Sequence, residues 1–239
     1  MFCAYCGQAM NVDDAMTCEA CGKPRAVPSP TSQAADIGQL VASHAKQATT
    51  SALAAFKTFA VNPTGGLRPA LDGLGPRNTL GAAIVFALFF AICLVIGTRR
   101  AASTGQSILG SLGGGNLEMS FGVLKLLFCG FVPFVGFFGA GWITRKVFRG
   151  ASNPAGDAFI AGAALLPIAF LLFITGVLGL ANVEVLAILS VFALCYVILI
   201  IHTGCRDISS IAEPGATIAV PVILLASAWF SKIILVAVL

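Results

Sequence analysis

Four cysteines near the amino terminus have the spacing of a metal site. Cys3 and Cys6 are separated by two residues, as are Cys18 and Cys21, and a glycine directly follows each pair. Two residues between thiols let both sulfur atoms point inward from one tight turn, and the glycine supplies the positive φ that such a turn often needs. Two such turns make a tetrahedral thiolate site. We therefore predict that Cys3, Cys6, Cys18 and Cys21 bind a structural Zn²⁺.

Two other metal chemistries fit these cysteines less well. A rubredoxin-like iron site uses similar paired turns, but the eleven-residue spacer between the pairs is short for that family, and no electron-transfer partner is visible. A catalytic zinc needs an open coordination position, and four sulfur ligands leave none for an activated water. The iron site stays the alternative to structural zinc.

Residues 1–23 contain few apolar side chains, so the metal must supply most of the folding energy of this module. Paired C-x-x-C motifs indicate thiolate chemistry in a reducing compartment, whereas a secreted disulfide framework would need a signal peptide, which we do not find. The module resembles the short zinc-ribbon heads at the amino termini of many bacterial membrane proteins. We expect it to lie in the cytosol.

The remainder of the chain has the composition of a polytopic membrane protein. Of 239 residues, 58% are hydrophobic and only 10% are charged, and the mean hydropathy is +0.95. These values lie far from the averages of soluble domains. The net charge of +4 forms no continuous basic face, so we expect a lipid bilayer and not a nucleic acid as partner.

Two segments connect the zinc ribbon to the membrane. Residues 24–35 are rich in Pro, Ser, Thr and Ala, which predicts a flexible linker. From Asp36 onward apolar residues recur every three or four positions until Asn62–Pro63, which predicts an amphipathic juxtamembrane helix over 36–61. That helix either lies in the headgroup plane or packs on another protein surface.

Residues 62–239 contain five apolar segments, each long enough to cross a bilayer. They are 79–98, 120–144, 158–180, 185–204 and 216–239. We therefore predict an all-α fold, namely a polytopic bundle of five transmembrane helices with a small amino-terminal four-cysteine zinc ribbon.

The distribution of basic residues predicts the orientation in the membrane. With the amino terminus inside, ten Lys and Arg fall on the inner side and two on the outer side, with Lys125 and Lys232 inside the spans. The inner residues are Lys23, Arg25, Lys46, Lys57, Arg68, Arg77, Arg145, Lys146, Arg149 and Arg206, and the outer ones are Arg99 and Arg100. This asymmetry predicts a cytosolic amino terminus and an outer carboxyl terminus, in what we expect to be a bacterial inner membrane.

A few groups inside or beside the spans are candidates for function. Pro167 lies within the third segment, where it removes a backbone donor and favours a kink, so this helix needs packing partners or borders a permeation path. Lys125 and Lys232 either snorkel to an interface or line a polar path. Asp157 and Glu184 flank the third segment, where we expect solvated helix ends.

Four short stretches of the membrane part match a known pattern. They are Asn62–Pro63 with Leu67, Leu71, Pro76 and Arg77; the basic turn Arg145–Gly150; the small-residue run Ala161–Pro167, which ends in Leu-Leu-Pro; and Tyr196 followed by His202. They resemble the Yip family (Ypt/Rab-interacting proteins and their bacterial relatives), whose members have five membrane helices and a cytosolic amino terminus. The resemblance covers residues 60–239 and implies a non-enzymatic membrane domain. The zinc ribbon departs from the eukaryotic pattern, so we transfer no trafficking role.

These features favour a membrane-anchored adaptor or membrane-organising protein without catalytic activity. Its zinc ribbon would bind a protein partner in the cytosol, and a homo-oligomer is a further candidate. The alternative is a transporter, channel or lipid-moving protein with a path beside Pro167. A membrane enzyme is least favoured, because no nucleophile–base pair is visible and the chain has only two His.

Overall fold

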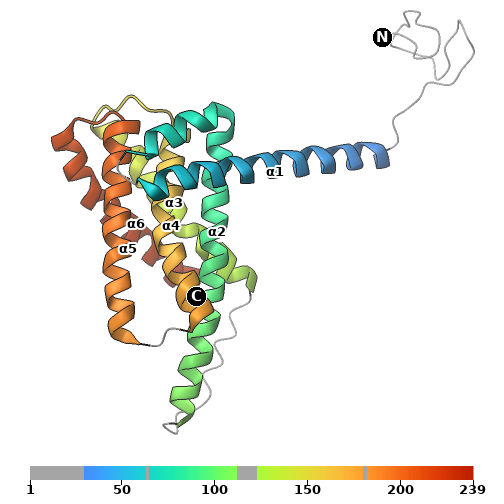
Figure 1. The fold of residues 1–239 in the computed structure, drawn as a ribbon, viewed down its shortest axis with the longest axis vertical. Helices are drawn as coiled ribbons and strands as arrows, with labels where there is room; N and C mark the ends of the chain where they lie inside the picture. The colour runs from blue at the N-terminus through green and yellow to red at the C-terminus, as the bar shows by residue number, and fades with distance from the viewer. Residues whose placement is uncertain (1–29, 63–64, 112–122, 180–181, 239) are drawn as a thin grey trace, which may run out of the picture. The chain divides into compact units, whose positions relative to one another are not determined.

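The computed structural model describes residues 30–62, 65–111, 123–179 and 182–238, and within these ranges the chain forms helices and no strand. The elements are α1 (Pro30–Val61), α2 (Leu67–Ser111), α3 (Val123–Val147), α4 (Pro154–Leu178), α5 (Val183–Thr203), the π-helical turn η1 (Gly204–Ile208) and α6 (Glu213–Val238) (Figure 1). The chain divides into two compact units, Met1–Ala45 and Lys46–Leu239. In the first unit only the part of α1 from Pro30 onward is described.

Five helices of the second unit are long and apolar enough to cross a membrane. The candidate spans are Asn78–Arg100, Val123–Val147, Pro154–Leu178, Glu184–Ile208 and Glu213–Ala237. Each overlaps one of the five apolar segments that the sequence predicts. The predictions of an all-helical fold and of a membrane protein with five apolar helices are therefore confirmed for the described residues.

Small residues let the helices of the bundle approach closely. Ala83, Ala87 and Ala91 form a buried stripe on α2, and Gly162 of α4 lies directly against it. A Cβ atom at Gly162 would lie 2.9 Å from the carbonyl oxygen of Ala83, so only glycine fits at this crossing without displacement of a backbone. Close packing of this kind replaces the hydrophobic driving force that lipid cannot supply between helices.

The second half of α1 belongs to the bundle. Ala52, Ala55 and Phe59 are buried, and the ring of Phe59 meets the rings of Phe86 and Phe159 edge-on, with centroids 5.9 and 6.3 Å apart. The sequence predicted a helix in the headgroup plane or on another protein surface, whereas the second half of α1 packs against the chain's own bundle. The helix also begins earlier than predicted, at Pro30 within the expected linker, since proline is well tolerated in a first helical turn.

A glycine changes the direction of α2 before it crosses the membrane. Gly75 has φ 67° and ψ 164°, a conformation that is essentially restricted to glycine. The Thr79 hydroxyl donates to the Gly75 carbonyl at 2.8 Å, one turn into the helix that follows the break. The short piece from Leu67 to Leu74 can therefore run in a different direction from the span that follows (Figure 1).

Candidate functional sites of the membrane bundle

The predicted zinc ligands Cys3, Cys6, Cys18 and Cys21 lie outside the described residues, so the zinc site stays a prediction. Among the described residues, no group of three or more His, Cys, Asp or Glu is arranged to hold a metal ion. The cysteines of the bundle lie apart from one another in the chain. Cys93, Cys129 and Cys205 are buried, and Cys195 is exposed.

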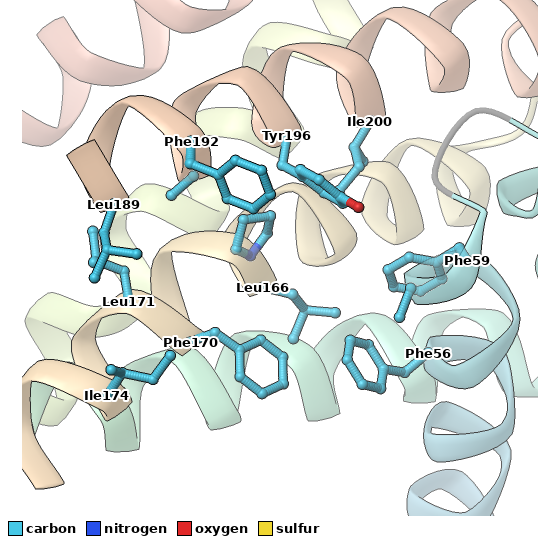
Figure 2. Close-up of a pocket in the computed structure, with 13 residues that line it drawn as sticks. Phe56, Phe59, Leu166, Phe170, Leu171, Ile174, Leu189, Phe192, Tyr196 and Ile200 are labelled. Carbon is cyan, nitrogen blue, oxygen red and sulfur yellow. The ribbon is translucent and has the colours of Figure 1, made fainter. Parts of the chain in front are cut away.

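An apolar pocket of about 270 Å³ lies beside Pro167 (Figure 2). Three helices form its wall: α1 contributes Phe56, Phe59 and Ala60, α4 contributes residues between Leu166 and Ile174, and α5 contributes residues between Leu189 and Ile200. All of them belong to the unit Lys46–Leu239. In the sequence, only Pro167 of these residues is a candidate for function, while Leu166 and Tyr196 stand out solely through the family resemblance.

The pocket is elongated along α4 and α5. Figure 2 shows Phe56 and Phe59 at one end and Ile174 with Leu189 at the other, with Leu166 and Phe170 between them on the α4 side. Eight residue steps separate Leu166 from Ile174, which corresponds to about 12 Å along a helix. The pocket therefore has the form of a groove parallel to two membrane helices.

The wall of the pocket is almost wholly hydrocarbon. The rings of Phe56 and Phe170 stack with centroids 5.3 Å apart, which brings α1 and α4 together at one side. Tyr196 supplies the single polar side chain of the wall, and its ring contacts that of Phe192 at 5.2 Å. Pro167 itself is half-buried, and α4 continues as one helix through it. Such a wall has no set of polar groups to coordinate an ion.

A second site is a buried ion pair where α3 meets α4. Arg145 Nε donates to Asp157 Oδ2 at 2.7 Å, and the two residues are only 6% and 4% exposed. Arg145 Nη1 also donates to the carbonyl of Ser152 at 2.7 Å, and the Ser209 hydroxyl donates to Asp157 Oδ1 at 3.4 Å. The expectation that Asp157 is a solvated helix end is wrong, because the turn between α3 and α4 folds the Arg145 side chain back over it.

The connection between α3 and α4 is tied to the connection between α5 and α6. The amide of Ala151 donates to the carbonyl of Ser209 at 3.0 Å, and that of Gly150 donates to the carbonyl of Arg145 at 2.9 Å. A Cβ atom at Gly150 would overlap the Ser209 carbonyl, so the contact requires glycine. Arg149 and Ser210 have φ of 57° and 53°, a left-handed conformation that costs a non-glycine residue about 1–3 kcal/mol. The ion pair therefore sits in a closely defined junction of four helices.

An open polar groove of about 450 Å³ borders this junction. Its wall includes Arg68, Asp72, Thr79 and Ser210. Arg68 forms an exposed ion pair with Asp72 at 3.2 Å and donates through Nη1 to the carbonyl of Asp207 at 2.7 Å. The Arg68 guanidinium therefore already has partners within the protein, and the exposed side chains of the pair mark this groove as a solvated part of the bundle.

The two lysines in the spans are exposed and contribute to neither pocket. Lys125 follows Val123, the first residue of α3, by two positions, so its long side chain lies within reach of an interface. Lys232 lies in the last two turns of α6 with its Nζ 5.6 Å from the ring centroid of Trp229. Both positions agree with snorkelling, and neither lysine lines the apolar pocket.

Comparisons with known proteins gave no family. No protein-family model matches the chain, and neither a curated protein nor a solved structure is similar to it at a significant level. The resemblance to the Yip family and to bacterial zinc ribbons therefore stays a prediction from the residues quoted above.

Proposed function

We propose that this protein is a membrane-anchored adaptor or membrane-organising protein without catalytic activity. A bundle of five apolar helices holds it in the bilayer, and a four-cysteine zinc ribbon at the amino terminus binds a protein partner in the cytosol. The observation that carries the proposal is the combination of two C-x-x-C pairs with five candidate spans in one chain. A module that needs a metal to fold and is joined to a membrane anchor is suited to present a binding surface at the membrane.

The cytosolic location of the ribbon rests on the basic residues. Arg145 is largely neutralised by Asp157, so we leave it out of the charge count, and nine inner residues still stand against two outer ones. Lys146, Arg149 and Arg206 are exposed around the α3–α4 and α5–α6 connections, which share one end of the bundle (Figure 1). The positive-inside rule favours that end as the cytosolic one.

The test is affinity purification from native membranes with metal analysis of the same sample. Cys18→Ser should abolish recovery of the protein partner and lower the zinc content, while the membrane domain still inserts. Cys195→Ser is the matched control, because it removes an exposed thiol of the bundle that is no part of the four-cysteine pattern. Unchanged recovery of the partner with Cys18→Ser would contradict the adaptor proposal.

The pocket beside Pro167 favours a second candidate, a protein that moves lipid. Its apolar wall argues against an ion path, since an ion in hydrocarbon needs polar or charged partners. In liposomes, Pro167→Ala should then change the rate of lipid transfer between leaflets, whereas Pro133→Ala on α3, a proline outside the pocket, should not. Absence of lipid transfer by the unmodified protein would remove this candidate.

A further inference from the structure

We propose that the apolar pocket between α1, α4 and α5 binds one acyl chain of a membrane lipid. This goes beyond the adaptor role, and it holds whether or not the protein moves lipid. The pocket is a concave site in a surface that otherwise faces hydrocarbon.

Water is a poor occupant of this pocket. A buried water needs two to four polar partners, and the wall offers the hydroxyl of Tyr196 as its one polar side-chain group. An empty pocket would leave the lining side chains without contacts on one side and so lose their dispersion energy. An apolar occupant therefore stabilises the protein relative to both a water-filled and an empty pocket.

The pocket opens where the bilayer supplies such an occupant. Its α4 and α5 residues fall inside the candidate spans Pro154–Leu178 and Glu184–Ile208. Phe170 and Phe192 belong to the wall and are nevertheless 36% and 63% exposed, so the mouth is continuous with the outer surface of the two helices. At this depth that surface meets lipid chains.

The shape of the pocket fits a chain that runs parallel to the helices. Its length of about 12 Å along α4 exceeds what one side chain fills. A lipid chain is already in hydrocarbon before it binds, so the hydrophobic effect contributes nothing to its binding. The free energy of binding comes from packing against the rings of Phe56, Phe170 and Phe192. Selective retention therefore depends on how well the groove is filled.

Occupancy also involves α1. Phe56, Phe59 and Ala60 close one end of the pocket, and Phe56 stacks on Phe170 at one side of it. A bound chain adds contacts between this part of α1 and the two spans. We expect the amides of residues 52–60 to exchange more slowly with deuterium when the pocket is filled.

The experiment uses the full chain in vesicles of phosphatidylethanolamine and phosphatidylglycerol that contain a phospholipid with a diazirine in its acyl chain. After photolysis, mass spectrometry locates the labelled residues. Labelling of the pocket residues Leu171 and Leu189 should exceed labelling at Leu225, a lipid-facing residue of α6, by about tenfold. Mere contact with surrounding lipid would label Leu225, which is 72% exposed, at least as strongly as the half-buried Leu171 and Leu189.

Pocket-filling variants provide the decisive comparison. Leu189→Trp fills the groove from α5, and Ala60→Phe fills it from α1, so a folding defect in one leaves the other as the test. Either should reduce labelling of Leu171 about tenfold. Leu225→Trp, the same kind of replacement on exposed α6 surface outside the pocket, should leave the labelling of Leu171 unchanged.

Three results would overturn the proposal. One is labelling of Leu171 that persists in both folded filling variants. Another is a cross-link between two copies of the chain at the pocket, which would make it a dimer interface. The third is co-purification of a non-lipid apolar compound that excludes the labelled lipid.

Discussion

Arg145 and Asp157 form an ion pair at 2.7 Å with both side chains buried, and this pair joins the end of α3 to the first turn of α4. The second carboxylate oxygen accepts from Ser209, so the connection from α5 to α6 is held by the same carboxylate. The two charges are only twelve residues apart in the chain, but they define how four helices meet. The basic turn Arg145–Gly150, which the sequence marks as a topology signal, is thus also a structural element.

Removing one partner of this pair should destabilise the bundle strongly. Asp157→Leu leaves the Arg145 guanidinium buried without its counter-charge, and such a loss typically costs about 3–5 kcal/mol. Arg145→Leu should cost a similar amount. The measurement is the free energy of unfolding in detergent, from denaturant titration followed by circular dichroism. The double variant should be less destabilised than the sum of the two single variants, because it leaves no buried charge behind.

The exposed pair Arg68–Asp72 is the matched control. Arg68 Nε lies 3.2 Å from Asp72 Oδ1, and the two side chains are 52% and 62% exposed. Solvated pairs of this kind contribute about 0–1 kcal/mol to the free energy of unfolding. Asp72→Leu should therefore change the free energy of unfolding much less than Asp157→Leu. Equal effects of the two replacements on the free energy of unfolding would show that burial does not make the Arg145–Asp157 pair more important for stability than an exposed pair.

Gly130 and Gly139 of α3 should respond oppositely to the same replacement. A Cβ atom at Gly130 would lie 2.6 Å from Ala91 of α2, whereas one at Gly139 meets nothing within 4 Å. Gly130→Ala should destabilise the bundle by about 1–3 kcal/mol through overpacking. Gly139→Ala should be neutral or stabilising by up to about 1 kcal/mol, because alanine is the better helix former. Denaturant titration of the two variants checks this, and equal stabilities would contradict the close α2–α3 contact.

The five membrane helices could be predicted because each depends on local composition alone. A long uncharged apolar stretch has few alternatives to a helix in a bilayer, so 158–180 and the other segments already contain the information. Helix ends are harder to predict, because they depend on capping contacts. Asn153 caps α4 by accepting from the amide of Gly156, which brings Pro154 to Asp157 into the helix and carries the carboxylate of Asp157 into the interior.

The two sites in the bundle depend on relations that composition does not contain. The ion pair requires the turn at Gly150 to bring Arg145 over Asp157, and a charge pattern alone reads both residues as solvated. The pocket depends on which faces of α4 and α5 are turned toward each other and on the packing of α1 against the bundle through Phe59. Pro167 indicated the correct part of α4, since proline in a membrane helix is a local signal, but it carries no information on which helices form the opposite wall.

The orientation in the membrane can be tested with reporters at the carboxyl terminus. With a cytosolic amino terminus and five crossings, an alkaline phosphatase fused after Leu239 should be active, and a green fluorescent protein fused there through the general secretion route should be dark. Neutralising the exposed Lys146, Arg149 and Arg206 together should raise the fraction of inverted molecules. A phosphatase that is inactive in the unmodified protein would reverse the assignment and place the zinc ribbon outside.

Metal removal should act on the amino-terminal module and spare the bundle. If Cys3, Cys6, Cys18 and Cys21 hold zinc, the purified protein contains about one Zn²⁺ per chain, and these thiols resist alkylation until a chelator removes it. A Cys195→Ser background eliminates the exposed thiol of the bundle, so the gain in alkylated cysteines reports the four ligands. The unfolding of the bundle should stay unchanged, because the contacts described above lie within Lys46–Leu239. Iron with visible absorbance would support the rubredoxin-like alternative, and four thiols that react fully before chelation would contradict either metal site.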